Sequence, residues 1–162
     1  MSKSLDLPAL FSSFTQDTRL LRLSTVLGEN KLLAECVRGE EGISQAYAFT
    51  VSALSTDAGI ALKALIGQPV LLELLTVGAD SRPFHGHVTA IELNGADGGF
   101  ARYTLTIAPW TDFLALGRDS RVFQNKSVFE ILDIVFGAYR GQGKLVPAWR
   151  YDLVERDLYP KR

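Results

Sequence analysis

A β-hairpin decides the fold of this chain, and it is encoded by residues 84–109, FHGHVTAIELNGADGGFARYTLTIAP. In the second half, apolar and polar residues alternate with the period of a strand that has one buried face and one solvated face, namely Tyr103, Leu105 and Ile107 against Arg102, Thr104 and Thr106. Asn94-Gly95 and Asp97-Gly98-Gly99 between the halves are turn dipeptides of antiparallel hairpins. The sequence therefore predicts strands over 84–93 and 100–109.

Four further strands are predicted by alternation or by short apolar runs, over 20–27, 32–38, 45–54 and 70–77. The first two flank Gly28, Glu29 and Asn30, and we expect them to form a hairpin. Cys36 then shares a face with Leu32 and Ala34. We expect its thiol to be buried and unreactive, because no His or Lys lies beside it in the sequence to lower its pKa.

Two helices are predicted. A short one over 60–66 would be capped by Thr56 or Asp57 and ended by Gly67 and Pro69. A longer one begins at a capping box formed by Ser127 and Glu130, and apolar residues recur at helical spacing up to Gly141. We expect the apolar stripe of this second helix to lie on the sheet.

The sequence beyond Gly143 lacks a periodic pattern but stays apolar, with Trp149, Tyr151, Leu153 and Leu158. These side chains have no following element to pack on, which predicts that the chain is an N-terminal fragment of a longer protein.

Composition narrows the classes of function. The chain has 162 residues, of which 47% are hydrophobic and 22% charged, as in an ordinary globular domain. The formal net charge of -1 gives no field for steering nucleic acid or anionic lipid. The single cysteine excludes an intrachain disulfide. No apolar run approaches the length of a membrane span, and the first 14 residues do not read as a signal peptide.

Only two histidines are available for catalysis or metal binding. His85 and His87 are two apart in a predicted strand, so both side chains would point to the same face. Further ligands would have to come from scattered carboxylates, so we expect both histidines to be packed or solvated. We expect no bound metal, no cofactor and no catalytic residue.

Several segments in order resemble the N-terminal region of VgrG proteins, the spike-tip components of bacterial type VI secretion systems. They are residues 49–55 (FTVSALS), 62–67 (LKALIG), 82–88 (RPFHGHV), 103–110 (YTLTIAPW) and 120–127 (SRVFQNKS). The resemblance covers about residues 18–158. It implies a mainly β fold with short helices (α+β), as an antiparallel β-barrel tube domain of the contractile-phage tail hub type.

The resemblance also implies an organisation and partners. Residues 1–17 would be an N-terminal segment, 18–143 a first tube-like barrel with a covering helix, and 144–162 the start of a linker to a second tube-like domain. The full-length protein would form a trimer, dock on the Hcp tube and support the puncturing needle. Effectors or tip proteins would attach through C-terminal regions. Such a protein assembles in the bacterial cytoplasm and is delivered into the target cell by the apparatus, without a signal peptide.

The contact surface is predicted on a polar and aromatic loop between two helical segments, formed by Arg118, Arg121, Phe123, Gln124, Asn125 and Lys126. An ordinary helix-capping loop would have the same composition. Three other functions remain open. They are a contractile phage or pyocin-like tail baseplate hub protein, a small hydrolase that uses His85 or His87, and a small oligonucleotide- or sugar-binding barrel.

Overall fold

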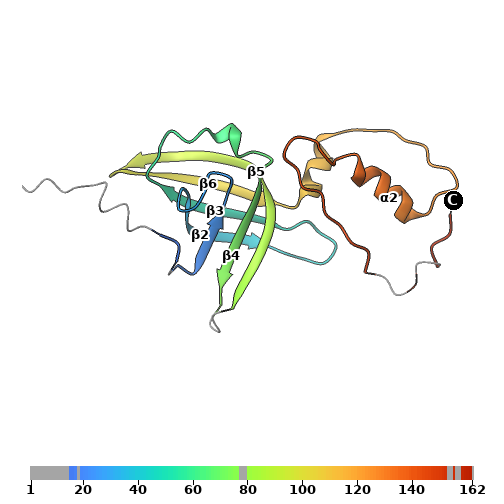
Figure 1. Ribbon diagram of the computed structural model, residues 1–162, viewed down its shortest axis with the longest axis horizontal. Helices are drawn as coiled ribbons and strands as arrows, with labels where there is room; N and C mark the ends of the chain where they lie inside the picture. Colours follow the sequence, from blue (N-terminus) through green and yellow to red (C-terminus); the bar gives the residue numbers. More distant parts are fainter. Residues whose placement is uncertain (1–14, 18, 77–79, 153–154, 156–157, 162) are drawn as a thin grey trace, which may run out of the picture. The chain divides into compact units, whose positions relative to one another are not determined.

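The hairpin predicted over residues 84–109 lies inside a six-stranded antiparallel sheet (Figure 1). The computed structural model describes residues 15–17, 19–76, 80–152, 155 and 158–161. The chain divides into two compact units, residues 1–109 and 110–162, and each unit is described by itself. The first unit contains β1 (Leu21–Ser24), β2 (Leu33–Glu40), β3 (Ala48–Ser55), the 3-10 helix η1 (Leu62–Ala64), β4 (Pro69–Leu75), β5 (Ser81–Asp97) and β6 (Phe100–Ala108). The second contains the 3-10 helix η2 (Trp110–Leu116) and the α-helix α2 (Val128–Gly137).

The central hairpin is longer and tighter than the sequence predicts. Strand β5 continues through Asn94 and Gly95 to Asp97, and only Gly98 and Gly99 form the turn. Both glycines have positive φ, 60° and 84°, which a two-residue turn with the twist of the sheet requires. The pairing register shifts between Leu93 and Gly95, so the Asn94-Gly95 dipeptide marks a bulge within the strand and not its end.

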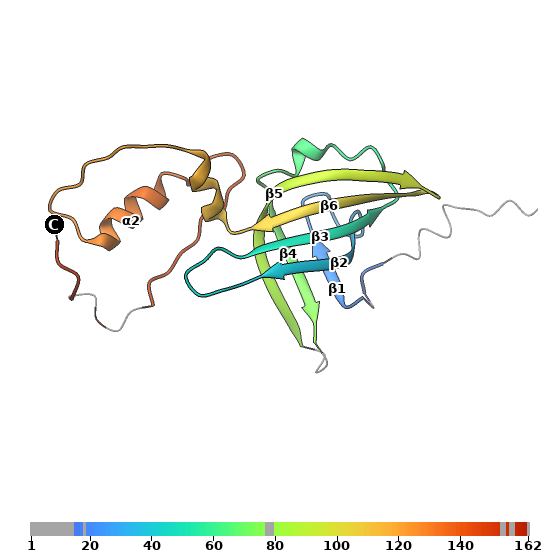
Figure 2. The same ribbon diagram turned by 180° about the vertical axis from the view of Figure 1, so that it is seen from behind.

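The sheet has the strand order β1-β4-β5-β6-β3-β2 and curls into a half-barrel, which Figure 2 shows from behind. Alternate residues of the strands point into the curl, and those of β6 and β3 are almost completely buried, as the alternation predicts. The core cluster consists of Leu23, Leu32, Ala34, Phe49, Val51, Ala53, Leu65, Val70, Leu72, Val88, Ala101, Tyr103, Leu105 and Ile107. The mainly β fold class is therefore confirmed.

The predicted hairpin between residues 20–27 and 32–38 is wrong. Strand β1 pairs with β4, with Leu21 opposite Leu74 and Leu23 opposite Leu72, so β1 and β2 occupy the two ends of the strand order. Gly28 and Asn30 do have the positive φ of a turn. The turn therefore carries the chain from one edge of the sheet to the other and does not join paired neighbours.

The expected burial of Cys36 is also wrong, because its side chain is exposed. The register between β2 and β3 shifts between Ala34 and Cys36. This bulge adds one residue, so Cys36 lies opposite Ser52 on the outer face, while Ala34 lies opposite the buried Ala53. A period of two counted through the bulge assigns Cys36 to the wrong face.

The short helix predicted over 60–66 is one turn of 3-10 helix, Leu62–Ala64, and its N-cap is Ala61 without a side-chain cap. Asp57 accepts a hydrogen bond from the backbone of Gly59 instead, over 2.7 Å. The predicted stop is confirmed, because Gly67 has a φ of 77° and β4 begins two residues later.

Helix α2 begins at the predicted capping box. The Ser127 backbone donates to Oε2 of Glu130 over 2.7 Å, and the Glu130 backbone donates to Oγ of Ser127 over 3.3 Å. The hydrogen bond that the Glu130 carboxylate accepts from the Ser127 backbone, followed by the interaction with the Ser127 hydroxyl, lowers the pKa of Glu130 below its ordinary value. The position of the apolar stripe of α2 on the sheet stays a prediction, because its described packing partners come from its own unit.

Those partners are aromatic. Phe136 of α2 packs edge-on against Trp110 and Trp149, with ring centroids 5.0 Å and 5.4 Å away. Tyr151 packs against Phe129 at 5.0 Å. Trp149 and Tyr151 therefore pack on the preceding helix, because the segment after Gly143 returns along α2, and they do not need a following element to cover them. Leu158 is exposed, and Leu153 lies outside the described residues.

Candidate protein-contact site

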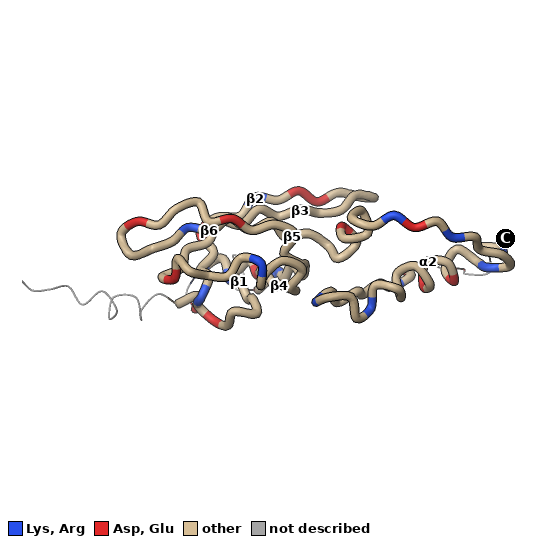
Figure 3. The backbone as a smooth tube through the Cα atoms, turned by 90° about the horizontal axis from the view of Figure 1, so that it is seen from above, with Lys and Arg blue, Asp and Glu red and all other residues tan. Residues whose placement is uncertain are grey.

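The predicted contact residues lie in the segment 117–127 that connects η2 to α2 and has no regular secondary structure. Arg118, Arg121, Gln124 and Asn125 are exposed, whereas Phe123 and Lys126 are half-buried. The loop thus presents mostly polar side chains around one aromatic ring. Its charged positions can be followed in Figure 3.

The C-terminal end of this loop is fixed by local geometry. Asn125 has a φ of 55°, a left-handed conformation in which Asn is among the favoured residues. It turns the chain directly before the Ser127 cap of α2. The expected contact loop is therefore also the helix-capping loop, and the two readings of the sequence describe one segment.

A pocket of about 390 Å³ lies between the loop and α2 with the turn that follows it. Arg121 and Asp119 both line it, and Nε of Arg121 contacts Oδ2 of Asp119 over 2.5 Å. Apolar atoms come from Phe123, Val135 and Tyr139. Among the described residues, its lining consists of Asp119, Arg121, Phe123, Val135, Ala138, Tyr139 and Gln142. The site can accept one small apolar side chain and a charged group beside it.

Sequence reasoning found the loop half of this pocket and missed the half formed by α2 and the turn that follows it. Val135 precedes Ala138 and Tyr139 by three and four residues, and Gln142 follows them by four and three, which is the spacing of one face of a helix. The signal was present, but such a stripe also fits a face that packs on a sheet, so spacing alone could not indicate a pocket.

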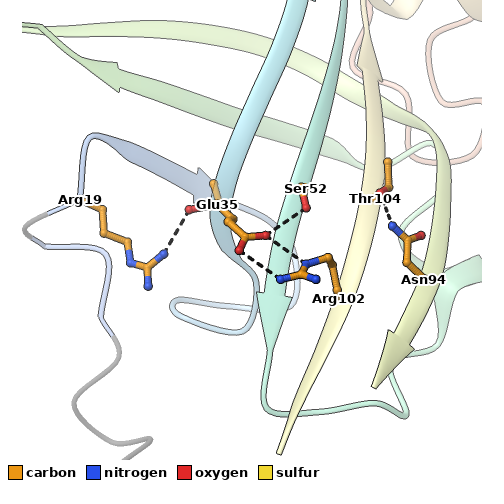
Figure 4. A network of polar contacts seen from close by, with 7 residues as sticks. Arg19, Glu35, Ser52, Asn94, Arg102 and Thr104 are labelled. Carbon is orange, nitrogen blue, oxygen red and sulfur yellow. Dashed lines mark hydrogen bonds and ion pairs between the residues drawn. The ribbon is translucent and has the colours of Figure 1, made fainter. Parts of the chain in front are cut away.

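The outer face of the sheet carries a polar network that sequence reasoning also missed (Figure 4). Nε and Nη2 of Arg102 contact the two carboxylate oxygens of Glu35 over 3.1 and 3.2 Å, and Ser52 donates to Glu35 over 3.3 Å. Asn94 donates to Thr104 over 2.8 Å. The Arg102–Glu35 pair joins β6 to β2 across β3, but its exposure limits its contribution to stability.

The two histidines lie in different environments. His85 is exposed, whereas His87 is 5% exposed, between Pro69 of β4 and Ala108 of β6 in the pairing register. Burial lowers the pKa of His87 below 6.5, because the charged imidazolium loses its hydration. Neither histidine lines the pocket beside α2. Within the described ranges, no three His, Cys, Asp or Glu side chains are grouped so that they could hold a metal ion.

A comparison with known protein families matches most of this chain. The family of the phage tail baseplate hub (GPD) matches residues 40–162. The chain belongs to the phage tail baseplate hub family. The match includes β3 to β6, the predicted contact loop and α2.

Curated relatives in this comparison are spike proteins of Pseudomonas aeruginosa. The type VI secretion system spike protein VgrG1a is 36% identical over 121 residues, and VgrG1b is 33% identical over 124 residues. These alignments cover 75% and 76% of this chain but only 19% and 17% of the two relatives. The chain thus spans less than a fifth of the length of these VgrG spike proteins, and its resemblance to them is confirmed.

A solved structure shares the fold of this baseplate hub chain. It is an E. coli component of the type VI secretion system, described as structurally similar to the T4 bacteriophage tail proteins gp27 and gp5. The TM-score is 0.65 at 18% identity, over 87% of this chain and 37% of that one. In the described part of this chain, no helix has the length and apolar character that a membrane crossing needs.

Proposed function

We propose that this chain is the hub region of a type VI secretion spike protein, which forms part of the base that docks on the Hcp tube and supports the puncturing needle. The proposal rests on the identity with VgrG spike proteins over three quarters of the chain. Membership of the baseplate hub family supports it, since a hub protein needs sheets and contact surfaces and no reaction centre.

In this proposal residues 18–143 are the first tube-like domain, formed by the curled sheet and a covering helix, and the closure of the sheet into a barrel within the assembled ring is part of the proposal. The protein would act as a trimer, with effectors or tip proteins carried by regions outside this sequence. It would assemble in the cytoplasm and leave with the apparatus. The loop with Arg118, Arg121, Phe123, Gln124, Asn125 and Lys126 would be a contact surface of the assembly.

A second candidate is a baseplate hub protein of a contractile phage or a pyocin-like particle. The specific observation in its favour is that the matching family is described as the phage tail baseplate hub. The spike assignment is preferred because the curated relatives are all spike proteins of the secretion system. A hydrolase or an oligonucleotide-binding barrel has no comparable support.

A deletion experiment tests the proposal. The gene that encodes this sequence is deleted in its source bacterium, and the amount of Hcp released into the medium is measured with and without the restored gene. We expect release to be lost and then restored. An Arg121→Glu gene should restore it poorly, whereas Ser120→Ala, in the same loop but outside the pocket lining, should restore it fully. Unchanged release in the deletion strain, with loss of phage or pyocin-like particles, would favour the second candidate.

A further inference from the structure

The β2–β3 connection, residues 41–47, has an unusual tip. Ile43 is 98% exposed, the highest value among the large hydrophobic side chains described as exposed. Ser44 beside it has a φ of 62°, a left-handed conformation uncommon for residues other than glycine. The connection therefore holds one branched aliphatic side chain fully in water, where it gains nothing for the folding of its own chain.

Two acidic residues precede Ile43, and no basic residue lies within the segment 40–47. Glu40 and Glu41 precede Ile43, which gives the segment 40–47 a formal charge of -2. Glu41 contacts Nη2 of Arg82 over 2.8 Å. Glu40 is exposed, and it forms no ion pair with another residue in the described part of the chain. The tip thus combines an apolar knob with a carboxylate available to a partner.

The pocket beside α2 has the complementary character. Its apolar wall of Phe123, Val135 and Tyr139 would receive an aliphatic side chain, and Arg121, which is paired with Asp119, also lines it. The loop segment 118–126 has three cationic residues, Arg118, Arg121 and Lys126, and one anionic residue, Asp119, for a formal charge of +2. Opposite charge around an apolar contact favours encounter and fixes its orientation.

We propose that Ile43 of one copy of this chain inserts into the pocket beside α2 of a second copy, with Glu40 facing Arg121 across the contact. The inference rests on the proposed function and names the partner of its contact loop. The two surfaces differ, so the contact is head-to-tail, and repetition with a suitable rotation closes a ring. One aliphatic knob and one exposed ion pair make a small contact, so it is weak between isolated chains and gains strength in a linked assembly.

Cross-linking between two labelled chains tests the contact without removing Ile43. Both carry Cys36→Ser, which removes the only native thiol. One carries Gln45→Cys beside the tip, and the other carries Gln142→Cys in the pocket lining. The two are mixed with a short bismaleimide, and the cross-linked heterodimer is measured by mass spectrometry. The matched control replaces Gln45→Cys by Glu29→Cys, which is also exposed but lies before β2, at the end opposite the tip.

We expect the heterodimer yield to exceed that of the Glu29→Cys control by about tenfold, since a docked tip raises the effective concentration of its thiol. Ile43→Asp in the Gln45→Cys chain should reduce the yield to the control level, and it leaves the core intact because the side chain is exposed. Glu40→Lys and Arg121→Glu should each weaken cross-linking, and their combination on opposite chains should restore it.

Equal yields for Gln45→Cys and Glu29→Cys would overturn the inference. A single chain with both Gln45→Cys and Gln142→Cys that links to itself at high dilution, without heterodimer in the mixture, would also overturn it, because the pocket would then receive its own tip. Failure here with normal dependence of Hcp release on the gene would leave the proposed function standing. If cross-linking succeeds but Hcp release does not depend on the gene, the proposed function is wrong and the contact stands.

Discussion

Nε1 of Trp149 donates a hydrogen bond to Oδ1 of Asp133 over 2.9 Å, and the same carboxylate oxygen accepts from the Tyr151 hydroxyl over 3.0 Å. Arg140 follows the end of α2, and its guanidinium carbon lies 4.8 Å from the centroid of the Trp149 ring. One aspartate of α2 therefore holds two aromatic residues of the segment that follows the helix.

Replacement of Trp149 should loosen the second unit. We expect Trp149→Phe, which keeps an aromatic ring but loses the hydrogen bond, to lower the free energy of unfolding by about 1 kcal/mol. Trp149→Ala should cost about 2 kcal/mol or more, because the contacts with Trp110 and Phe136 are also lost. Urea denaturation followed by circular dichroism measures both values.

The neighbouring Arg150 provides the control for that experiment. Its contact with Asp152 is 3.8 Å long and both side chains are about 90% exposed, so Arg150→Ala should change stability by less than about 0.5 kcal/mol. Equal effects of Trp149→Ala and Arg150→Ala would mean that the aromatic packing does not stabilise this unit.

The capping box of α2 should be measurable as well. Ser127→Ala removes the hydroxyl that accepts from the Glu130 backbone, and we expect a loss of about 1 kcal/mol. Ser120→Ala, at an exposed position of the preceding loop, should have no comparable effect. The comparison uses the denaturant midpoints of the two variants, and identical midpoints would show that the hydroxyl contributes nothing to the helix.

Burial of His87 predicts sensitivity to acid. Its pKa is lowered in the folded state, so the unfolded chain binds more protons once the pH falls below about 6.5, the ordinary value. The free energy of unfolding should therefore decrease as the pH falls from about 7 through 6.5, and level off below the lowered pKa. Equilibrium unfolding over this range measures the slope.

Two variants separate His87 from other titrating groups. His87→Gln should flatten this part of the pH profile whatever its effect on absolute stability. His85→Gln, at the exposed histidine of the same strand, is the matched substitution control. A slope that persists in His87→Gln would assign the acid sensitivity to a different group.

The exposed position of Cys36 gives a prediction opposite to the one made from the sequence. In the folded protein one thiol per chain should react with Ellman's reagent, and denaturation in urea should not increase the number of reactive thiols. Cys36→Ser should abolish the reaction and change stability by less than about 0.5 kcal/mol. A thiol that reacts only after denaturation would place Cys36 in the core.

Local signals in the sequence predicted local structure well. The alternation around Tyr103 predicted β6, and the spacing of Ser127 and Glu130 predicted the start of α2, because the forces that form these elements act within a few residues. Features that depend on distant partners were missed. The bulge beside Glu35 reverses the face of Cys36, and the pairing of Leu21 with Leu74 depends on a strand about fifty residues away.

The candidate site was likewise predicted only in part from the sequence. Arg121 and Phe123 were singled out because a polar loop with an aromatic residue is a recognisable pattern between helices. Their pocket partners Val135 and Tyr139 carry no such pattern, and the tip at Ile43 lies in a segment that the strand prediction over 45–54 does not reach. Surface shape is a property of packed elements, and a single sequence reports it only indirectly.

The placement of β1 beside β4 has a consequence for synthesis on the ribosome. Leu21 and Leu23 leave the ribosome early, but their pairing partners Leu74 and Leu72 emerge only after β2 and β3 have been made. Strand β1 therefore has no pairing partner until β4 has been made, and its pairing then closes a long loop at an entropic cost. We expect nascent chains that end before β4 to lack a complete core and to depend on chaperones, whereas chains released beyond β6 fold unaided.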